Sequence, residues 1–355
     1  MKKFLLISLA LILAAGLIFS GCTPSTPTQT PTQTPTQTPT ATPTHELVRI
    51  DVLTSPLGTP GPTEGMSVTE TVDKYHPWLR LTVAETPGWV YNMQFMGKYP
   101  ERWKNTLVQS DDYTQAMAAK PLAPLFTEPV TGMRRVITHS YNAYFFTTLD
   151  PNIKTPADLE GKKVGLGLMT QPAYTIAPMQ LLDYGYGLEG KVDYQHIGVA
   201  SEITALVDGL VDAIWIVNLN TVGGEYALAG FTPQLIAAGK QLYFVGFNEE
   251  AFQNVANKTG IMMHSIVVPA GTVPGQTEDI LSFMHPAGLW AHVTFPEEYA
   301  YEVVKTCVEH SDTVDQYVPA EGWDAKSGAM FLTQANAHPG AIRAFEEAGI
   351  TLPEK

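Results

Sequence analysis

Cysteine and charge are both scarce in this chain. It has two cysteines in 355 residues, Cys22 and Cys307, and only the second belongs to the part that could form a core. No internal disulfide can therefore stabilise that part, which depends on the size of its hydrophobic core. Charged residues make up 16% of the chain, the net charge is −14, and there is no basic run. These features argue against binding to nucleic acid or to anionic lipid surfaces.

Motifs of common enzymes are also missing. The sequence contains no G-x-S-x-G, no H-E-x-x-H and no Gly-Lys-Ser/Thr phosphate loop, and the GLG at 165–167 lacks the remaining spacing of a dinucleotide motif. His285 and His292 lie seven residues apart in a β-rich run, which is a poor metal pair. Cys307 lies in an apolar, helix-like run that predicts a buried, inert thiol. We therefore predict no enzymatic activity, no metal and no cofactor.

One long hydrophobic run is present, and it lies at the N-terminus. Two lysines precede the apolar residues 4–19, and a Ser-Gly pair lies directly before Cys22. This layout is typical of a secretory signal, and the run is short for a membrane span, which needs about 20 residues. We predict that residues 1–21 are a lipoprotein signal peptide and that Cys22 is lipidated. The alternative is an ordinary cleaved signal that happens to carry a cysteine, since Phe19 stands where lipoprotein signals usually have Leu.

The segment 22–44 is Cys22 followed by a Thr/Pro/Gln repeat without hydrophobic periodicity. Such a segment buries too little apolar surface to offset its ordering entropy, so we predict a disordered tether. Its prolines favour an extended conformation of about 3.1 Å per residue, and hence a reach of up to roughly 70 Å. The composition is also compatible with O-glycosylation. With two or three acyl chains on Cys22, the protein would be anchored at the outer face of the cytoplasmic membrane.

The body that follows alternates between strand-like and helix-like segments. Short β-branched runs and amphipathic runs succeed one another, which points to parallel α/β sheets. The predicted strands are 47–53, 79–84, 106–109, 164–168, 192–197 and 213–217, with β-rich runs at 135–147 and 280–295. The predicted helices are 66–75, 90–97, 156–159, 173–183 and 201–207 (Ser201 as N-cap, Asp208-Gly209 as its end), then helices after Pro296 and His338. Two α/β modules joined by two long β-rich runs predict a bilobed protein with a cleft.

The β-rich runs also place the lobe boundaries. The chain would leave lobe 1 near residue 139, build lobe 2, and return near 285. We predict that lobe 1 comprises 45–139 and 286–355, and that lobe 2 comprises 140–285.

Several segments resemble a known family. Residues 158–167 (DLEGKKVGLG) are similar to a segment that several families of periplasmic solute-binding proteins share. Further segments resemble the TAXI subfamily of TRAP transporter receptors in particular, in the same order and spacing over about 85–350. These are 86–93 (TPGWVYNM), 107–111 (LVQSD), 207–213 (VDGLVDA), 268–272 (VPAGT) with Gly275-Gln276, 337–341 (AHPGA) and 347–349 (EAG).

The resemblance implies a fold and a function. The fold is the bilobed periplasmic-binding-protein type II fold, in which two α/β lobes joined by crossing strands enclose a ligand cleft. The function is capture of a small organic acid or amino acid, such as glutamate or 2-oxoglutarate, and its delivery to membrane permease subunits outside the cytoplasm. A ligand-sensing or ABC-type binding lipoprotein on the same fold is the alternative, and an exported enzyme is a weaker one.

The chain departs from the family where a ligand would lie. The loop 55–61 (SPLGTPG) lacks the usual tyrosine pair, Trp89 replaces a serine, and Asn218-Leu219-Asn220 stands in place of a Gly-x-Pro segment. The added indole predicts a bulkier or more apolar ligand.

Candidate binding residues follow from the position of ligands in α/β sheets, beyond the carboxyl ends of the strands. There the free N–H groups of helix N-termini can bind a carboxylate. We expect the backbone near Gly88 and Thr170 to do so, together with the Thr86 and Thr170 hydroxyls. Amides would bind the remaining polar groups, and aromatic rings would line the apolar part. The predicted ligand-binding residues are Ser55, Gly58, Thr59, Thr86, Gly88, Trp89, Asn92, Gln109, Ser110, Thr170, Gln171, Tyr174 and Asn218.

These residues have structural alternatives. Thr86 and Thr170 can cap helices instead, and Asn92 can bind its own backbone. Trp215 could line the apolar part of the site, but its apolar strand favours core packing. Tyr141 and Tyr144 on the crossing could touch the ligand, or they could pack the hinge instead. Asp111 and Asp112 are expected to begin a helix, or to pair with the ammonium group of an amino-acid ligand.

Overall fold

The computed structural model describes residues 45–121, 125–221, 226–228, 231–318 and 322–355, without the side chains of 216–221. The predicted signal peptide, the Cys22 lipidation site and the tether lie outside the described residues. Within those ranges, no helix is both long enough and apolar enough to cross a membrane.

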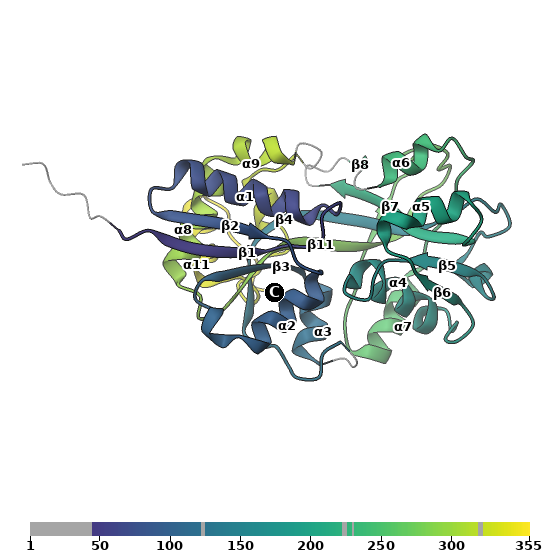
Figure 1. Cartoon of the computed structure of the whole chain (residues 1–355), viewed down its shortest axis with the longest axis horizontal. Coiled ribbons are helices and arrows are strands. Elements are labelled where there is room, and N and C mark those ends of the chain that lie inside the picture. Colours follow the sequence, from purple (N-terminus) through teal and green to yellow (C-terminus); the bar gives the residue numbers. More distant parts are fainter. Residues whose placement is uncertain (1–44, 122–124, 222–225, 229–230, 319–321) are drawn as a thin grey trace, which may run out of the picture. The chain divides into compact units, whose positions relative to one another are not determined.

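A single mixed β-sheet runs through both lobes of the body (Figure 1). Its order is β2-β1-β3-β11-β4-β7-β5-β6. The three strands at each end are parallel, but the two in the middle run antiparallel to their neighbours. The parallel sheets predicted for the two α/β modules are therefore confirmed, and the two long strands between them, for which the sequence predicted no direction, pair with each other. The strands are β1 (Val48–Leu53), β2 (Leu79–Ala84), β3 (Thr106–Asp111), β4 (Met133–Thr148), β5 (Lys163–Leu166), β6 (Asp193–His196), β7 (Ala213–Thr221) and β11 (Ile280–His292), with the short strands β8 (Ala227–Leu228), β9 (Tyr243–Val245) and β10 (His264–Val268) beside them.

In lobe 1, helices cover both faces of the parallel strands. Leu107 and Val108 are both fully buried, one in each of two hydrophobic cores, because successive strand residues point to opposite faces. Val72 of α1 packs on the first face and Met93 of α2 on the second. The helices of lobe 1 are α1 (Gly61–Tyr75), α2 (Trp89–Lys98), the 3-10 turn η1 (Pro100–Arg102), α3 (Asp112–Ala119), α8 (Glu297–Glu309), α9 (Ser311–Tyr317), α10 (Ala325–Ala329) and α11 (Pro339–Glu347).

Lobe 2 repeats this arrangement with shorter helices. Ile214 and Trp215 of β7 enter the cores on opposite faces, and the Trp215 core is continuous with that of α2 and α3 in lobe 1. Its helical segments are η2 (Pro156–Leu159), η3 (Pro172–Tyr174), α4 (Ile176–Gln180), η4 (Leu181–Gly185), α5 (Val199–Val207), α6 (Thr232–Ala237) and α7 (Glu249–Thr259).

Three helix boundaries differ from the prediction. Helix α1 begins at Gly61, ahead of the predicted residue 66, because prolines fit the first turn of a helix. Helix α5 begins behind Gly198, so Ser201 is not its N-cap, although its predicted end at Asp208-Gly209 is confirmed. The predicted helix 173–183 consists of three short segments, η3, α4 and η4.

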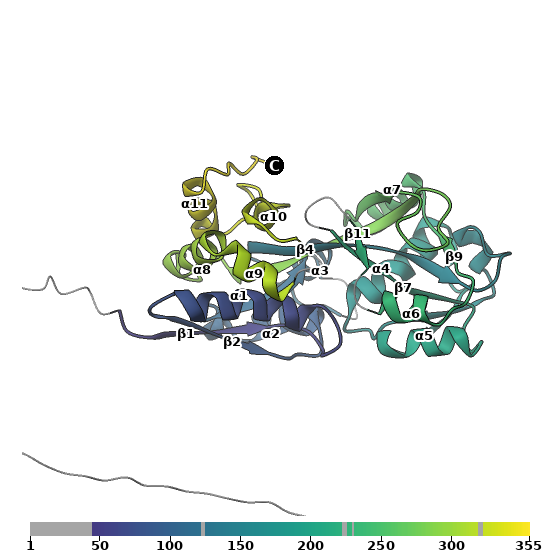
Figure 2. The ribbon, with the colours of Figure 1, turned by 90° about the horizontal axis from the view of Figure 1, so that it is seen from above.

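Strands β4 and β11 cross from one lobe to the other (Figures 1 and 2). The two α/β lobes joined by crossing strands are therefore confirmed, and the predicted boundaries at residues 139 and 285 fall inside these strands. Arg135 of β4 is fully buried beside the crossing. Its Nη2 lies 2.8 Å from Asp112 Oδ1, and its guanidinium lies 5.0 Å from the ring centre of Trp290 on β11. The ion pair attaches helix α3 to the crossing strands.

The two lobes touch each other on the side of α3 and α4. The Tyr113 hydroxyl of α3 donates to Gln180 Oε1 of α4 at 2.8 Å. Lys120 Nζ donates to the backbone oxygen of Gly260 at 3.0 Å. Nearer the cleft, a Cβ atom added at Gly88 of lobe 1 would lie only 2.5 Å from the backbone oxygen of Thr170 in lobe 2. The structure therefore has its lobes closed on each other.

Several structural alternatives from the sequence are confirmed. Cys307 is fully buried in α8, and burial raises the pKa of its thiol well above the usual value, which makes it inert. Trp215 is fully buried, and its indole N–H donates to the backbone oxygen of Ala173 at 2.8 Å. Asp111 is the N-cap of α3 and accepts from the backbone N–H of Thr114.

Candidate ligand-binding pocket

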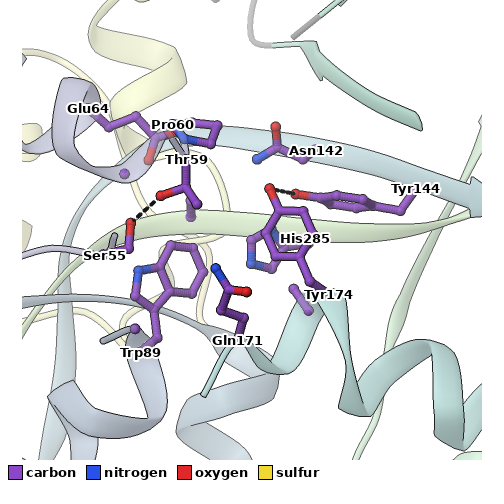
Figure 3. Close-up of a pocket in the computed structure, with 14 residues that line it drawn as sticks. Ser55, Thr59, Pro60, Glu64, Trp89, Asn142, Tyr144, Gln171, Tyr174 and His285 are labelled. Carbon is purple, nitrogen blue, oxygen red and sulfur yellow. Dashed lines mark hydrogen bonds between the residues drawn. The ribbon is translucent and has the colours of Figure 1, made fainter. Parts of the chain in front are cut away.

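A small pocket lies between the lobes, directly on the crossing strands (Figure 3). Its cavity volume is about 40 Å³, which is room for roughly three water molecules. Lobe 1, lobe 2 and the crossing strands all contribute to its wall. The lining residues are Ser55, Thr59, Pro60, Gly61, Glu64, Gly88 and Trp89 from lobe 1, Gln171, Ala173 and Tyr174 from lobe 2, and Asn142, Tyr144, His285 and Ala287 from β4 and β11.

The loop between β1 and α1 forms one part of the lobe 1 wall. The Thr59 hydroxyl donates to the backbone oxygen of Pro56 at 2.7 Å, so Ser55 Oγ donates to Thr59 Oγ1 at 2.8 Å. Gly61, the first residue of α1, packs so tightly that an added Cβ would lie 2.0 Å from Ser55 Oγ. The loop thus brings two hydroxyl groups and a helix N-terminus to the pocket.

The N-terminus of α2 forms the other part of that wall. Gly88 precedes the helix with φ 132°, a conformation that favours glycine, and Trp89 is the first helical residue. The indole of Trp89 stacks on the ring of His285, with centroids 4.8 Å apart and an interplanar angle of 18°. Trp89 Nε1 is buried and has no hydrogen-bond partner among the described residues.

His285 of β11 lies behind Trp89 and contacts a buried carboxylate. Its Nε2 is 2.8 Å from Asp111 Oδ2, although the two groups are not aligned as a hydrogen bond. Within the described part of the chain, neither ring nitrogen of His285 has a hydrogen-bond partner. The ring is 3% exposed and Asp111 is fully buried. An imidazole and a carboxylate are therefore held together at the back of the pocket.

A second buried carboxylate, Glu64, belongs to the first turn of α1. Its Oε1 accepts from Ser140 Oγ at 2.6 Å, and its Oε2 accepts from Gln109 Nε2 at 3.3 Å. The residue is 1% exposed and lines the pocket. Strands β3 and β4 thus hold this carboxylate in place.

Lobe 2 contributes the amide of Gln171 and a tyrosine, Tyr174, which pairs with Tyr144 of the crossing strand β4. Gln171 Oε1 accepts from the backbone N–H of Leu168 at 3.0 Å, which fixes the loop behind β5. The Tyr144 hydroxyl of β4 donates to the Tyr174 hydroxyl at 3.2 Å, and the two rings meet edge to face. Burial raises the pKa of Tyr144 well above its usual value, so its hydroxyl stays neutral.

The predicted ligand-binding residues separate into two groups in the structure. Residues in the first group line the pocket, although a role in binding stays a prediction for each of them. These are Ser55, Thr59, Gly88, Trp89, Gln171 and Tyr174. The second group lies outside the lining. It comprises Gly58, Thr86, Asn92, Gln109, Ser110 and Thr170, while the side chain of Asn218 lies outside the described residues.

Two residues of the second group, Thr86 and Asn92, have structural contacts that account for them. Thr86 Oγ1 donates to the backbone oxygen of Thr54 at 2.8 Å and accepts from the N–H of Gly88 at 3.3 Å. Gly88 therefore does not supply the free donor predicted there. Asn92 Nδ2 donates to the backbone oxygens of Thr54 at 2.7 Å and Gln109 at 2.9 Å, which attaches α2 to the ends of β1 and β3.

The sequence did not point to Glu64 or to most of the lining residues on the crossing strands, although it raised Tyr144 as a residue of either the hinge or the site. Asn142 and His285 are directly paired in the register of β4 and β11, so they share a face, and Tyr144 and Ala287 lie two residues along from them on that face. The alternation of polar and aromatic residues in both strands indicated that one face of each strand is distinct. Only the pairing register shows which of the two faces lines the pocket.

The indole of Trp89 narrows this pocket. Its stacking on His285 fills space, and the cavity of about 40 Å³ leaves little room for a large ligand in the closed form. The prediction of a bulkier ligand therefore finds no support in the pocket.

Comparisons with solved structures find similar chains. The TctC solute binding protein from Polaromonas is 14% identical, with a TM-score of 0.47 over 80% of this chain and 91% of that chain. MatC from Rhodopseudomonas palustris, solved with bound malate, is 15% identical, with a TM-score of 0.48 over 84% of this chain and 96% of that chain. The aliphatic sulphonate binding protein SsuA from Escherichia coli is 13% identical, with a TM-score of 0.41 over 85% and 83%.

No curated protein matches the chain. The NMT1-like family does match, over residues 65–349. This range covers both lobes, both crossing strands and most of the pocket lining. The chain therefore belongs to the NMT1-like family.

Proposed function

We propose that the protein is an extracytoplasmic solute-binding receptor that captures a small organic acid or amino acid between its lobes. One observation carries the proposal: a small pocket enclosed by both lobes and by the strands that connect them. Ligand sites are typically concave, largely apolar and provided with a few polar groups, and they favour the boundary between domains. A ligand held there would favour the closed state because it contacts both lobes at once.

The helix N-termini supply donors for an acid group. Gly61 and Trp89 are the first residues of α1 and α2, and both line the pocket. Backbone N–H groups in a first helical turn have no acceptor within the helix and carry a partial positive charge. They can bind a carboxylate without a lysine or arginine.

The pocket offers little support for catalysis. A nucleophile needs a base within hydrogen-bond distance. His285 is the obvious base, but no described hydroxyl or thiol is hydrogen-bonded to its ring nitrogens. Cys307 is fully buried in α8, within the lobe 1 core. We therefore propose binding without chemical change of the ligand.

The finer assignments rest on sequence resemblance. The TAXI-like segments favour a receptor of a TRAP-type transporter that delivers a glutamate-like or 2-oxoglutarate-like ligand to a membrane permease. An ABC-type or sensing lipoprotein would have the same lobes and pocket, and the identity of the permease encoded beside it would distinguish the two.

A thermal-shift screen of the purified body tests the proposed function. Amino acids and small organic acids would be supplied one at a time, and one class is expected to raise the melting temperature. A ligand at 100 times its Kd stabilises the folded state by about 2.7 kcal/mol, or roughly 5 °C for a protein of this size. If no compound shifts the melting temperature while some substrate is turned over, the receptor proposal is wrong.

We also propose that Cys22 carries the membrane anchor. A Cys22→Ser change should move the protein from the membrane fraction to the soluble fraction, because the thiol that accepts the lipid is lost. Ligand affinity should not change. Fractionation and immunoblotting measure the outcome, and a variant that stays with the membrane would show that the anchor lies elsewhere.

A further inference from the structure

The pocket between the lobes is small, and the lobes around it are already in contact. Its cavity volume of about 40 Å³ holds roughly three water molecules, which is comparable to an acid of about two or three carbons. A Cβ added at Gly88 would lie 2.5 Å from the backbone oxygen of Thr170, so main chain meets main chain at the cleft. A longer ligand must therefore hold the lobes apart or displace a side chain from the wall.

The indole of Trp89 is the largest side chain in that wall. It begins helix α2 and stacks on the ring of His285, with centroids 4.8 Å apart. Figure 3 shows it among Ser55, Gln171 and His285. The side chain of His285 is only 3% exposed, so an indole that turned out of the pocket would give up the stack and uncover this ring to water. The stack therefore holds the indole inside the pocket.

The same indole carries a buried donor without a partner. Among the described residues, none accepts a hydrogen bond from Trp89 Nε1. In Figure 3 this nitrogen lies on the side of the indole toward Ser55, which also lines the pocket. A buried N–H group that has lost water without gaining an acceptor is costly. A carboxylate oxygen of a bound acid would supply that acceptor, and hydrogen bonds to charged groups are the stronger ones.

We propose that Trp89 limits the length of the ligand and also binds it. Its indole admits acids of about two or three carbons and excludes longer ones, and its Nε1–H donates to the ligand carboxylate. This inference rests on the proposed receptor function, and it gives the receptor a shorter ligand than the glutamate-like one that the sequence resemblance favours. A purely structural Trp89, which only covers His285, is the competing explanation.

Acids that grow by one methylene at a time test the proposal on the unmodified protein. The probes are acetate to pentanoate, glycine to L-norvaline, and glyoxylate to 2-oxopentanoate, with L-glutamate and 2-oxoglutarate as long polar acids, all measured by calorimetry. Within a series that binds, affinity should fall about 10-fold or more at the first member that is too long. If an acid of four or more carbons binds as tightly as the shorter ones, the Trp89 proposal is wrong although the receptor function stands. If no acid binds, both are wrong.

Two variants separate the bulk of the indole from its N–H group. Trp89→Ala removes both, so acids of four or five carbons should gain about 10-fold in affinity while the shortest acids, which lose their donor, bind more weakly. Trp89→Phe keeps an aromatic ring against His285 but has no N–H, so the preference for short acids should remain while every acid binds about 10-fold more weakly. The side chain is only half-buried, so both variants are expected to fold, which their melting temperatures would verify.

Tyr91→Ala provides the matched control, because Tyr91 belongs to the same helix, is 39% exposed and does not line the pocket. It should change neither the affinity for short acids nor the preference for them. A folded Trp89→Ala protein with an unchanged length preference would show that the indole is structural. A Trp89→Phe protein that binds every acid as tightly as the unmodified protein would show that Nε1 does not contact the ligand.

Discussion

Replacing Gly88 by alanine is expected to weaken ligand binding by about 100-fold or more, because the lobes could no longer close. The added Cβ would lie 2.5 Å from the backbone oxygen of Thr170, in the opposite lobe. Backbone atoms cannot move aside as a flexible side chain can, so the lobes themselves must separate. The φ of 132° at this position adds strain for any residue other than glycine.

A glycine in lobe 2 provides the matched control for this change. Gly187 also has a positive φ, 69°, but an added Cβ there would meet nothing within 4 Å. Gly187→Ala should therefore cost some stability without affecting ligand affinity. Small-angle X-ray scattering with saturating ligand should show a smaller radius of gyration for the control than for Gly88→Ala. If Gly88→Ala binds ligand as tightly as the control does, closure at this contact is not required for binding.

Replacing Trp215 by alanine is expected to lower the free energy of unfolding by about 3–5 kcal/mol, as for other large aromatic residues in cores. The indole is fully buried and packs against the rings of Phe146 and Phe247, with centroids 4.7 and 5.7 Å away. Its N–H donates to Ala173, whose backbone would lose that partner. The cavity left behind would lie in the core that both lobes share.

Urea denaturation measures this effect, with Leu210→Ala as the control because Leu210 is 64% exposed in the same lobe. A Trp215→Phe variant, which fills most of the cavity, should regain much of the stability and bind ligand as the unmodified protein does. If Trp215→Phe is stable but has lost ligand binding, the indole belongs to the binding site and its assignment to the core is wrong.

The elements of lobe 1 could be predicted well from the sequence. The strand predicted at 79–84 is β2 (Leu79–Ala84), and the helix predicted at 90–97 is α2 (Trp89–Lys98). The alternation of apolar and polar residues in strands and their helical spacing in helices are local signals. They can therefore be recognised without knowledge of the rest of the fold. The start of α1 was missed because Pro60 and Pro62 indicate a loop in the sequence. Prolines also fit the first turn of a helix, and that is where these two lie.

The site was harder to predict because a polar residue at a strand end can serve the backbone instead of a ligand. Asn92 and Thr86 were predicted to bind the ligand, but they lie outside the pocket lining and their side chains bind backbone groups of lobe 1. Glu64 was missed because it reads as an ordinary acidic residue in the first turn of a helix. Only the packing of α1 on β3 and β4 buries it beside the pocket.

We propose above all that the protein binds a small acid in this pocket and leaves it unchanged. Equilibrium dialysis against the best compound from the thermal-shift screen, followed by mass spectrometry of the recovered compound, tests it most directly. The proposed function predicts that one molecule binds per chain and is recovered intact, and that no product appears on either side of the dialysis membrane. A compound that is not retained, or that is recovered as a different molecule, would contradict it.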